Sequence, residues 1–254
     1  MTIHTRTQNN IAMIEIARPE RKNALTSAMY QQMADALLIA QTDAQVRAIL
    51  IHGQEDIFTA GNDLEEFAKN PPLGSNAPVF QFMQALSTAT KPVLAAVTGA
   101  AVGIGTTLLL HCDLVYAADN AKFSMPFTSL GLCAEFASSA LLQLNTGYVK
   151  AAEKLLMGEP FTAEEALEMN IVNRLLPPSE VIKYAIGRAE RFNFLPPDAV
   201  RSTKELMRTT HRKLIAETIA AEAAEFSRLL KTDQAKEAFA AFFERRKPDF
   251  ARFS

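Results

Sequence analysis

Short apolar runs alternate with segments of helical periodicity along most of the chain. The runs lie at residues 11–16, 48–52, 92–97, 113–117 and 121–124. Apolar runs of this length, bounded by polar and turn-forming residues, predict buried strands. Residues 26–42 show the spacing of a helix, and Thr26 or Ser27 can cap its start. This alternation of strands and helices predicts an α/β fold.

The stretch between the second and the fourth run adds three further elements. Residues 63–69 predict a short capped helix, and the prolines and glycine of residues 71–75 predict a loop. Residues 105–112 are apolar on nearly every helical face, which predicts a buried helix.

From about residue 177 onward the chain is rich in helix-forming residues. Helical spacing of apolar positions recurs at residues 179–193, 197–207, 211–231 and 233–244. Apolar stripes such as Ile219, Ala223 and Phe226 can serve the core, a subunit interface or the closure of a ligand site. The sequence therefore predicts a helical C-terminal region.

Two glycine-bearing turns are the main candidates for a ligand site. Residues 58–63 read Phe-Thr-Ala-Gly-Asn-Asp, and residues 98–105 read Thr-Gly-Ala-Ala-Val-Gly-Ile-Gly. Each follows an apolar run and leads into a helical pattern, where the first backbone N–H groups lack partners. Two such turns together can hold an oxygen that gains negative charge, as in an oxyanion hole. A plain strand-turn-helix junction gives the same pattern.

Other glycine-dependent sites do not fit the sequence. Gly103 and Gly105 lack the third glycine of a dinucleotide-binding turn. The lysine of a phosphate-binding loop and the GxSxG motif of a nucleophile elbow are both absent. A main-chain oxyanion site remains, and it needs a group that transfers protons.

Composition and charge exclude several classes of partner. The 254 residues carry a net charge of −2 with acids and bases interspersed, so we expect no nucleic-acid partner. Apolar runs shorter than the ~18–20 residues of a membrane span predict no membrane insertion. The start of the chain lacks a secretory signal, and Cys112 and Cys133 stand alone, which together favour a cytoplasmic protein. The 4 histidines lack ligand spacing, so no metal is expected.

Glu135 is the candidate proton-transfer group. It lies in residues 126–139 with apolar neighbours on both sides. Burial in such surroundings would raise the pKa of its carboxyl group toward the working pH, whereas a solvated loop glutamate would have no such role. Ser138 and Ser139 are expected to cap the helix that follows.

Several motifs follow one another in order along nearly the whole chain. They are Arg18-Pro19 with Asn23-Ala24-Leu25, Ala60-Gly61-Asn62-Asp63, the second glycine turn, Cys112-Asp113-Leu114 and Phe243-Glu244-Arg245-Arg246. As an ordered set they resemble the crotonase superfamily of enoyl-CoA hydratases and isomerases. The resemblance implies an α/β spiral core of ββα units at residues 1–195 and a helical trimerisation region at residues 196–254. It also implies a homotrimer or dimer of trimers that acts on an acyl-CoA thioester and needs no separate cofactor, because coenzyme A is part of the substrate.

The same resemblance assigns roles to individual residues. It implies that the main-chain N–H groups of Asn62 and Ile104 hold the thioester oxygen. Ile104 stands where many relatives have the middle of three glycines. The residues implied to border the substrate are Arg18, Lys22, Ala24, Ala60, Gly61, Asp63, Leu64, Gly103, Phe127 and Arg245. The walls of the acyl site are expected from loops such as residues 67–82, which leaves the chain length of the substrate open.

The reaction depends on which carboxylates are present. Hydratases of this superfamily use two glutamates, and the matching positions here hold Thr107 and Phe127. Glu135 stands where isomerases of the peroxisomal type carry their base. The resemblance therefore favours a Δ3,Δ2-enoyl-CoA isomerase. The alternatives are a hydratase that uses Glu135 alone and a non-catalytic acyl-CoA-binding protein.

Overall fold

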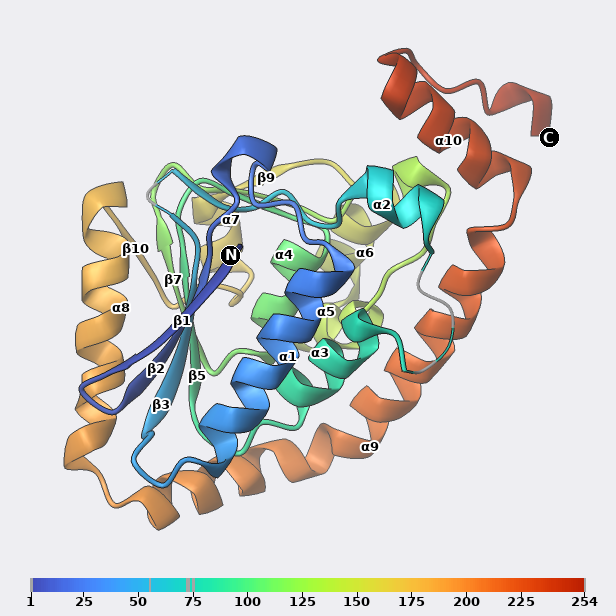
Figure 1. Ribbon diagram of the computed structural model, residues 1–254. Coiled ribbons are helices and arrows are strands. Elements are labelled where there is room, and N and C mark those ends of the chain that lie inside the picture. The colour runs from blue at the N-terminus through green and yellow to red at the C-terminus, as the bar shows by residue number, and fades with distance from the viewer. Residues whose placement is uncertain (1, 55, 72–73, 75, 254) are drawn as a thin grey trace.

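The computed structural model describes residues 2–54, 56–71, 74 and 76–253, and it contains two β-sheets with helices around them (Figure 1). The larger sheet has the strand order β1-β2-β3-β5-β7-β10. Its strands are β1 (Ile3–Gln8), β2 (Ile11–Ile16), β3 (Ala48–His52), β5 (Val93–Val97), β7 (Leu114–Ala118) and β10 (Arg174–Leu176). β1 pairs antiparallel with β2, and the other neighbours are parallel. Every residue of β3 and β5 is buried, as expected for strands covered on both faces.

The smaller sheet has the order β4-β6-β8-β9. Its strands are β4 (Ile57–Thr59), β6 (Ala100–Val102), β8 (Lys122–Ser124) and β9 (Phe161–Thr162). β4, β6 and β8 are mutually parallel, and each follows a strand of the larger sheet along the chain. The repeat is thus strand, short strand, helix. This arrangement agrees with the expected α/β spiral of ββα units.

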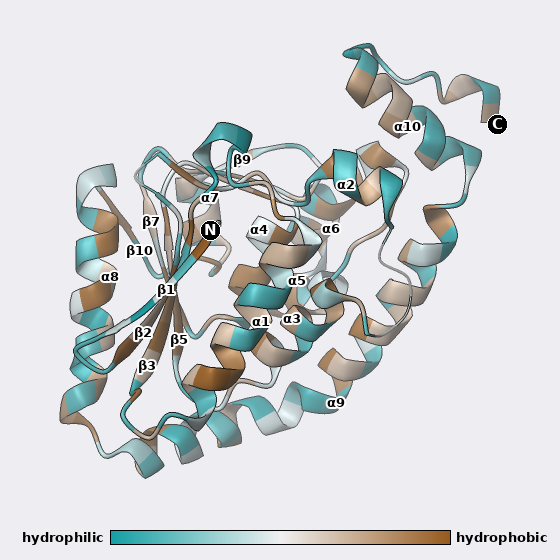
Figure 2. Cartoon of the chain, in the orientation of Figure 1, coloured by the Kyte–Doolittle hydropathy of each residue, from teal (hydrophilic) through white to brown (hydrophobic). Residues whose placement is uncertain are grey.

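Helices cover both faces of the larger sheet. The α-helices of the described residues are α1 (Ser27–Thr42), α2 (Leu64–Lys69), α3 (Pro78–Ser87), α4 (Ile104–Thr107), α5 (Ser138–Thr146), α6 (Tyr148–Met157), α7 (Ala163–Glu168), α8 (Val181–Glu190), α9 (Pro197–Leu229) and α10 (Asp233–Glu244). In Figure 1, α8 covers one face, and α1, α3, α4 and α5 lie on the other. Figure 2 shows hydrophobic residues concentrated along the strands and hydrophilic residues on the outer sides of the helices.

Several predicted elements are confirmed. The strands at residues 11–16 and 48–52 form as β2 and β3, and Thr26 caps α1 by accepting the Met29 N–H at 3.3 Å. The apolar stretch at residues 105–112 forms α4 and a 3₁₀ helix, Leu108–His111. The loop predicted at residues 71–75 falls partly outside the described residues.

Two expectations from the sequence were wrong. The two helices predicted at residues 197–207 and 211–231 form one helix, α9, which ends at Leu229, because no residue between them interrupts helical geometry. The segment at residues 67–82 is not entirely loop, since α3 begins at Pro78, whose fixed φ suits the first turn of a helix.

The long helix α9 is fastened to the sheet near its start. Lys204 Nζ donates to Asp113 Oδ2 at 2.6 Å and to the Lys91 carbonyl oxygen at 2.7 Å. Arg208 also donates to Asp113, at 3.3 Å. From this attachment α9 runs along the lower edge of the domain toward α10 (Figure 1).

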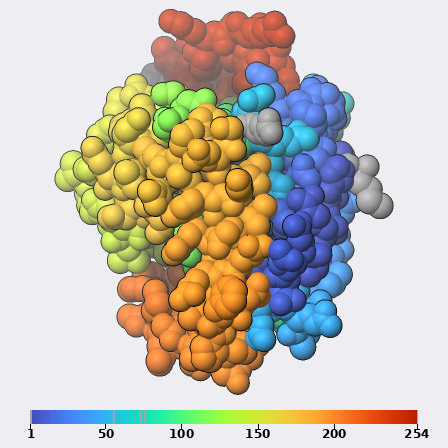
Figure 3. Space-filling model, turned by 90° about the vertical axis from the view of Figure 1, so that its left-hand side faces the viewer, coloured from blue at the N-terminus to red at the C-terminus, as the bar shows by residue number. Residues whose placement is uncertain are grey.

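The last helix, α10, packs beside α2 and the 3₁₀ helix Thr128–Leu130. Phe239 stacks on Phe67 with 6.3 Å between ring centroids. A Cβ at Gly131 would lie 2.9 Å from the Ala235 backbone, so glycine allows the close approach of α10. Figure 3 shows the C-terminal segment at one end of the molecule. Within the described residues, no helix is long and apolar enough to cross a membrane.

Candidate functional site

The two glycine turns lie side by side because β4 and β6 are parallel neighbours and both turns leave the same edge of the sheet. Their contact is tight. A Cβ at Gly61 would lie 2.6 Å from the Val102 carbonyl oxygen, and a Cβ at Gly105 would lie 2.6 Å from Thr59 Cγ2. Gly61 also has a φ of +85°, a conformation that favours glycine. Glycine is therefore required here for packing and for backbone conformation.

The contact brings together the two predicted oxyanion donors. Asn62 follows Gly61 in the first turn, and Ile104 is the first residue of α4. Within the described part of the chain, neither backbone N–H donates to a protein acceptor, although those of Asp63 and Gly103 do. Ile104 is fully buried, and unlike its neighbour Gly103 it is not among the residues that line either of the two cavities beside the turns. Two unpaired main-chain donors are thus available to a ligand.

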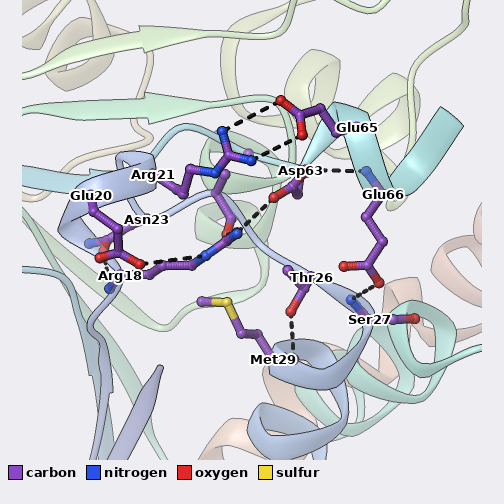
Figure 4. Close-up of polar contacts among 12 residues, drawn as sticks. Arg18, Glu20, Arg21, Asn23, Thr26, Ser27, Met29, Asp63, Glu65 and Glu66 are labelled. Carbon is purple, nitrogen blue, oxygen red and sulfur yellow. Dashed lines mark hydrogen bonds and ion pairs between the residues drawn. The ribbon is translucent and has the colours of Figure 1, made fainter. Parts of the chain in front are cut away.

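Side chains from residues 18–29 hold the first turn in place (Figure 4). Arg18 Nη1 donates to Asp63 Oδ2 at 2.8 Å and to the Ala24 carbonyl oxygen at 2.9 Å. Asp63 caps α2 by accepting the Glu66 N–H at 3.2 Å. Burial raises the pKa of Asp63, but the hydrogen bonds from Arg18 and Glu66 outweigh it, and the net pKa is lowered. Asp63 is therefore an ionised structural anchor.

A second pair of contacts links the same segment to α2. Arg21 Nη2 donates to Glu65 Oε2 at 3.0 Å, and Glu66 Oε1 accepts the Ser27 N–H at 3.0 Å (Figure 4). The backbone of Lys22 contributes as well, since its carbonyl oxygen accepts the Ala60 N–H at 3.0 Å. The turn and its helix are held as one unit.

A cavity of about 520 Å³ opens between the two turns, α2, the segment after β8 and α10. Eight of the residues predicted for the site line it: Ala24, Ala60, Gly61, Asn62, Asp63, Leu64, Gly103 and Phe127. Arg18, Lys22 and Arg245 are not in this lining. Arg18 is turned toward Asp63, and the side chains of Lys22 and Arg245 are exposed. Phe242 and Phe243 of α10 complete the wall, in line with one of the three roles that the sequence left open for the C-terminal apolar stripes.

A second cavity, of about 30 Å³, adjoins the first and contains Glu135. Asn62, Phe67 and Phe226 line both cavities. The rest of the lining is mostly apolar and consists of Val79, Phe80 and Met83 of α3, Phe136, and Ile219, Ala223 and Ser227 of α9. The predicted segment at residues 67–82 therefore contributes to the lining, but from α2 and α3 rather than from a loop.

Glu135 is buried, as its apolar neighbours indicate. Burial is the main reason that its pKa is raised to about 8. A hydrogen bond from Thr107 Oγ1 to Glu135 Oε1, at 3.0 Å, acts in the opposite direction, and the charge of Glu222 adds to the rise. A carboxyl group with this pKa can accept and release a proton near neutral pH.

Thr107 and Phe127 occupy the two positions where the hydratase pattern has glutamates. Thr107 directs its hydroxyl to Glu135. Phe127 lines the large cavity and lies edge-on to Phe226, with 6.5 Å between ring centroids. Neither side chain supplies a second carboxylate.

The backbone around Glu135 has an unusual conformation that the sequence did not reveal. Phe136 and Ala137 both have a φ of +56°, in the left-handed region that non-glycine residues rarely adopt. His111 Nε2 donates to the Phe136 carbonyl oxygen at 2.8 Å, and the two rings stack with centroids 3.8 Å apart. Burial lowers the pKa of His111 to about 3, so the ring is neutral.

The expected serine cap of α5 is absent. Ser138 Oγ is buried and has no hydrogen-bond partner among the described residues, and Ala137 occupies the N-cap position. Instead Glu222 of α9 accepts the N–H groups of Ala137 at 2.5 Å and Ser139 at 2.9 Å. A carboxylate from a helix 85 residues away in the chain provides the cap, so local sequence gave no sign of it.

Tyr30 is another site residue that the sequence did not indicate. Its hydroxyl donates to Asn62 Oδ1 at 2.5 Å. Burial, with a smaller contribution from the charge of Glu135, raises the pKa of Tyr30 well above its ordinary value. The phenol therefore stays protonated and holds the side chain of Asn62. No cluster of metal-ligating side chains is present in the described ranges.

Two nested sheets, paired glycine turns and a helical C-terminal region define this protein as one of the crotonase fold. Pseudomonas aeruginosa OdaA has the same fold, with a TM-score of 0.94 and 44% identity over 96% of this chain and 99% of that chain. An enoyl-CoA hydratase/isomerase from Pseudoalteromonas atlantica T6c matches with a TM-score of 0.94 and 37% identity over 98% of this chain and 100% of that chain. Residues 6–252 match the pattern of the enoyl-CoA hydratase/isomerase family, and the chain belongs to this family.

Named relatives include both hydratases and isomerases. The chain is 31% identical to the 2,3-dehydroadipyl-CoA hydratase of Escherichia coli (strain K12), over 96% of each chain. It is 36% identical to the human protein enoyl-CoA delta isomerase 2, covering 84% of this chain and 55% of the longer relative. Most of the named relatives are hydratases or probable hydratases, but the isomerase matches at a higher identity, so the names do not assign the chain to one subgroup.

Proposed function

We propose that this protein is a Δ3,Δ2-enoyl-CoA isomerase. Glu135 removes a proton from C2 of a 3-enoyl thioester, and the thioester oxygen takes up the resulting negative charge. The N–H groups of Asn62 and Ile104 stabilise this oxygen in the dienolate. Glu135 then returns the proton to C4, which leaves the double bond between C2 and C3, in conjugation with the thioester.

The observation that carries the proposal is the environment of Glu135. Among the described residues that line the small cavity it is the one carboxylate, and its hydrogen-bonding neighbour is a threonine. A single base that accepts and returns a proton is sufficient for isomerisation. Addition of water also requires a group that orients and activates the water, a task suited to a second carboxylate.

The binding roles are part of the same proposal. Ala24, Ala60, Gly61, Asp63, Leu64, Gly103 and Phe127 contact the coenzyme A moiety or the thioester in the large cavity. Arg18 and Lys22 act on the coenzyme A moiety indirectly, because they hold the first glycine turn in place. Arg245 approaches the phosphates of coenzyme A. The acyl chain enters the small cavity beside Glu135.

Hydration is the second candidate, and the names of the relatives favour it. Most of those named are enoyl-CoA hydratases, including the Escherichia coli relative. If the protein is a hydratase, Glu135 alone activates the water molecule that adds to the double bond. A non-catalytic acyl-CoA-binding protein is the alternative of another class.

An assay with two substrates separates these functions. Purified protein receives a 3-enoyl-CoA or, separately, a 2-enoyl-CoA, and the absorbance of the conjugated thioester is followed. Isomerase activity predicts that the signal rises with the first substrate and persists with the second. A rapid loss of signal with the second substrate would identify a hydratase, and binding of both without turnover would identify an acyl-CoA-binding protein.

Assembly into a homotrimer or a dimer of trimers is also a proposal. The C-terminal region, residues 196–254, carries exposed apolar side chains on α9, including Leu206 and Met207, which are compatible with burial against another subunit. Light scattering of the purified protein tests the oligomeric state, and a monomeric mass would exclude both assemblies.

A further inference from the structure

The C-terminal helix α9 reaches the segment that carries Glu135 through one buried side chain. Glu222 is 8% exposed, and its two oxygens accept the N–H groups of Ala137 and Ser139. These donors lie at the first turn of α5, whose N-cap residue, Ala137, has no side-chain hydrogen bond to offer. Unpaired N–H groups at a helix start are stabilised by an accepting carboxylate.

The contact also fixes a strained part of the backbone. Phe136 and Ala137 immediately follow Glu135, and both have left-handed φ angles. For residues other than glycine this conformation is costly and persists only where surrounding contacts maintain it. Here His111 holds the Phe136 carbonyl oxygen from one side, and Glu222 holds the Ala137 N–H from the other. These two contacts therefore hold the backbone that immediately follows Glu135.

We propose that Glu222 is a positioning residue for Glu135. By capping α5 it maintains the left-handed pair that directs the Glu135 carboxylate into the small cavity, and its own charge lies close enough to influence the protonation of Glu135. This inference rests on the proposed role of Glu135 as the proton shuttle. Glu222 itself does not touch the substrate.

The groups that face Glu135 determine at which pH its carboxyl group ionises. From α4, the Thr107 hydroxyl stabilises the ionised form, and from α9 the Glu222 carboxylate opposes it. Tyr30 of α1 and Cys133 also face Glu135, and both remain protonated because their pKa values are raised. His111, which contacts the next residue, is neutral. Burial raises the pKa of Glu222, whereas the N–H groups that it accepts favour its ionised form, and in that form it is the neighbour whose removal takes away a negative charge.

The test compares Glu222→Gln with Glu225→Gln on the same helix. Glu225 is solvated and pairs with Arg228, so its substitution removes the same charge without touching the segment of Glu135. A glutamine at position 222 can accept only one of the two N–H groups. The rates are measured with a 3-enoyl-CoA across a range of pH values, and the oligomeric protein is used throughout.

We expect Glu222→Gln to lower kcat about 100-fold, the loss that a misplaced catalytic group produces, while KM changes little. The pH at which activity is half-maximal should move toward acid, because the charge that raises the pKa of Glu135 is gone. Glu225→Gln should change neither quantity. A Glu222→Gln enzyme with unchanged kcat and unchanged pH midpoint would overturn the inference.

Two further measurements distinguish positioning from general damage. In a Glu135→Gln background, adding Glu222→Gln should cause no further loss, because the residue acts through Glu135. If the two losses add, Glu222 has another role and the inference fails. If Glu135→Gln alone keeps full activity, the proposed function itself is wrong, which is a separate result.

The unmodified protein offers a test that does not depend on whether a variant folds. The amide hydrogens of Ala137 and Ser139 should exchange with solvent as slowly as those of the central strands, since both are bonded to a buried carboxylate. Fast exchange at both amides would show that the cap is open in solution and would overturn the inference.

Discussion

The two halves of the candidate site are built in different ways. The oxyanion half consists of main-chain groups at the ends of two parallel strands, β4 and β6, in which glycines allow the turns to touch. The proton-transfer half is one side chain, Glu135, on an irregular segment held by His111 and Glu222 from distant parts of the chain. The first half is a property of the sheet, whereas the second depends on side-chain contacts between remote elements.

The two halves should therefore differ in how well they tolerate amino-acid substitutions. Main-chain donors do not depend on the identity of their own side chains, so the bulk of Ile104 is compatible with its proposed role provided that the turns stay in contact. A segment maintained by individual hydrogen bonds is sensitive to each of them. The predictions below test this contrast.

The largest effect is expected from Glu135→Gln. Losing the proton shuttle should lower the isomerase rate by about 10³–10⁴-fold, near the upper end of what general acid–base catalysis contributes. Binding of a saturated acyl-CoA should be nearly unchanged, as measured by calorimetry, because the oxyanion half stays intact.

The same variant should be more resistant to unfolding at alkaline pH. The pKa of Glu135 is raised from its ordinary value of 4.5 to about 8 in the folded protein. The protonated carboxyl group therefore adds fully to the free energy of unfolding below about pH 4.5, and this contribution is lost as the pH rises through about 8. Glutamine does not ionise and avoids this loss. The melting temperatures of variant and wild type, measured near neutral pH and above pH 8, should differ more at the higher pH. A difference in melting temperature that stays constant would contradict the raised pKa.

The next largest effect should follow from Gly61→Ala. A Cβ there would meet the Val102 carbonyl oxygen at 2.6 Å and push the two turns apart. Loss of one oxyanion donor costs about 10²–10³-fold in kcat. Gly147→Ala is the matched control, since Gly147 has a similar φ of +82° but open space around it. Comparable losses of activity in both variants would show that backbone strain, rather than separation of the turns, is responsible.

A smaller effect should appear in acid. The pKa of His111 is about 3 in the folded chain against an ordinary value of 6.5, so the unfolded chain binds a proton that the folded chain does not. The free energy of unfolding should therefore fall as pH decreases from 6.5 toward 3. Urea unfolding at a series of pH values measures this slope, and His111→Gln should show a shallower one.

The smallest effect is expected at Thr107. Its hydroxyl stabilises the ionised form of Glu135, so Thr107→Val should raise the pKa of Glu135 further and move the rising part of the pH–rate profile to higher pH. Near neutral pH the rate should drop several-fold. Thr107→Ser retains the hydroxyl and should behave as wild type; a shift of equal size in both variants would exclude the hydrogen bond as its cause.

The sequence predicted most of the fold, the paired glycine turns and the burial of Glu135, but not the contacts that hold the segment around Glu135. Apolar runs identify β2 and β3 because central parallel strands are buried on both faces, and Gly61 and Asp63 mark their turn by local rules. The capping of α5 was predicted incorrectly, since serines at its start imply a local cap whereas the structure uses Glu222. Tyr30 and His111 were missed for the same reason, because their partners lie 32 and 25 residues away along the chain. Tertiary contacts of this kind leave no periodic signal.

The continuity of α9 also restricts how this protein can tolerate insertions and deletions. The helix is attached at Lys204 to the sheet and at Glu222 to the segment of Glu135, with no loop between them to absorb a change in length. Inserting one residue between these points would turn Glu222 by about 100° and advance it by about 1.5 Å. Even a four-residue insertion, which nearly restores the rotation, would displace the carboxylate by about 6 Å. This stretch of the chain should therefore keep a fixed length, whereas the surface loops elsewhere can grow.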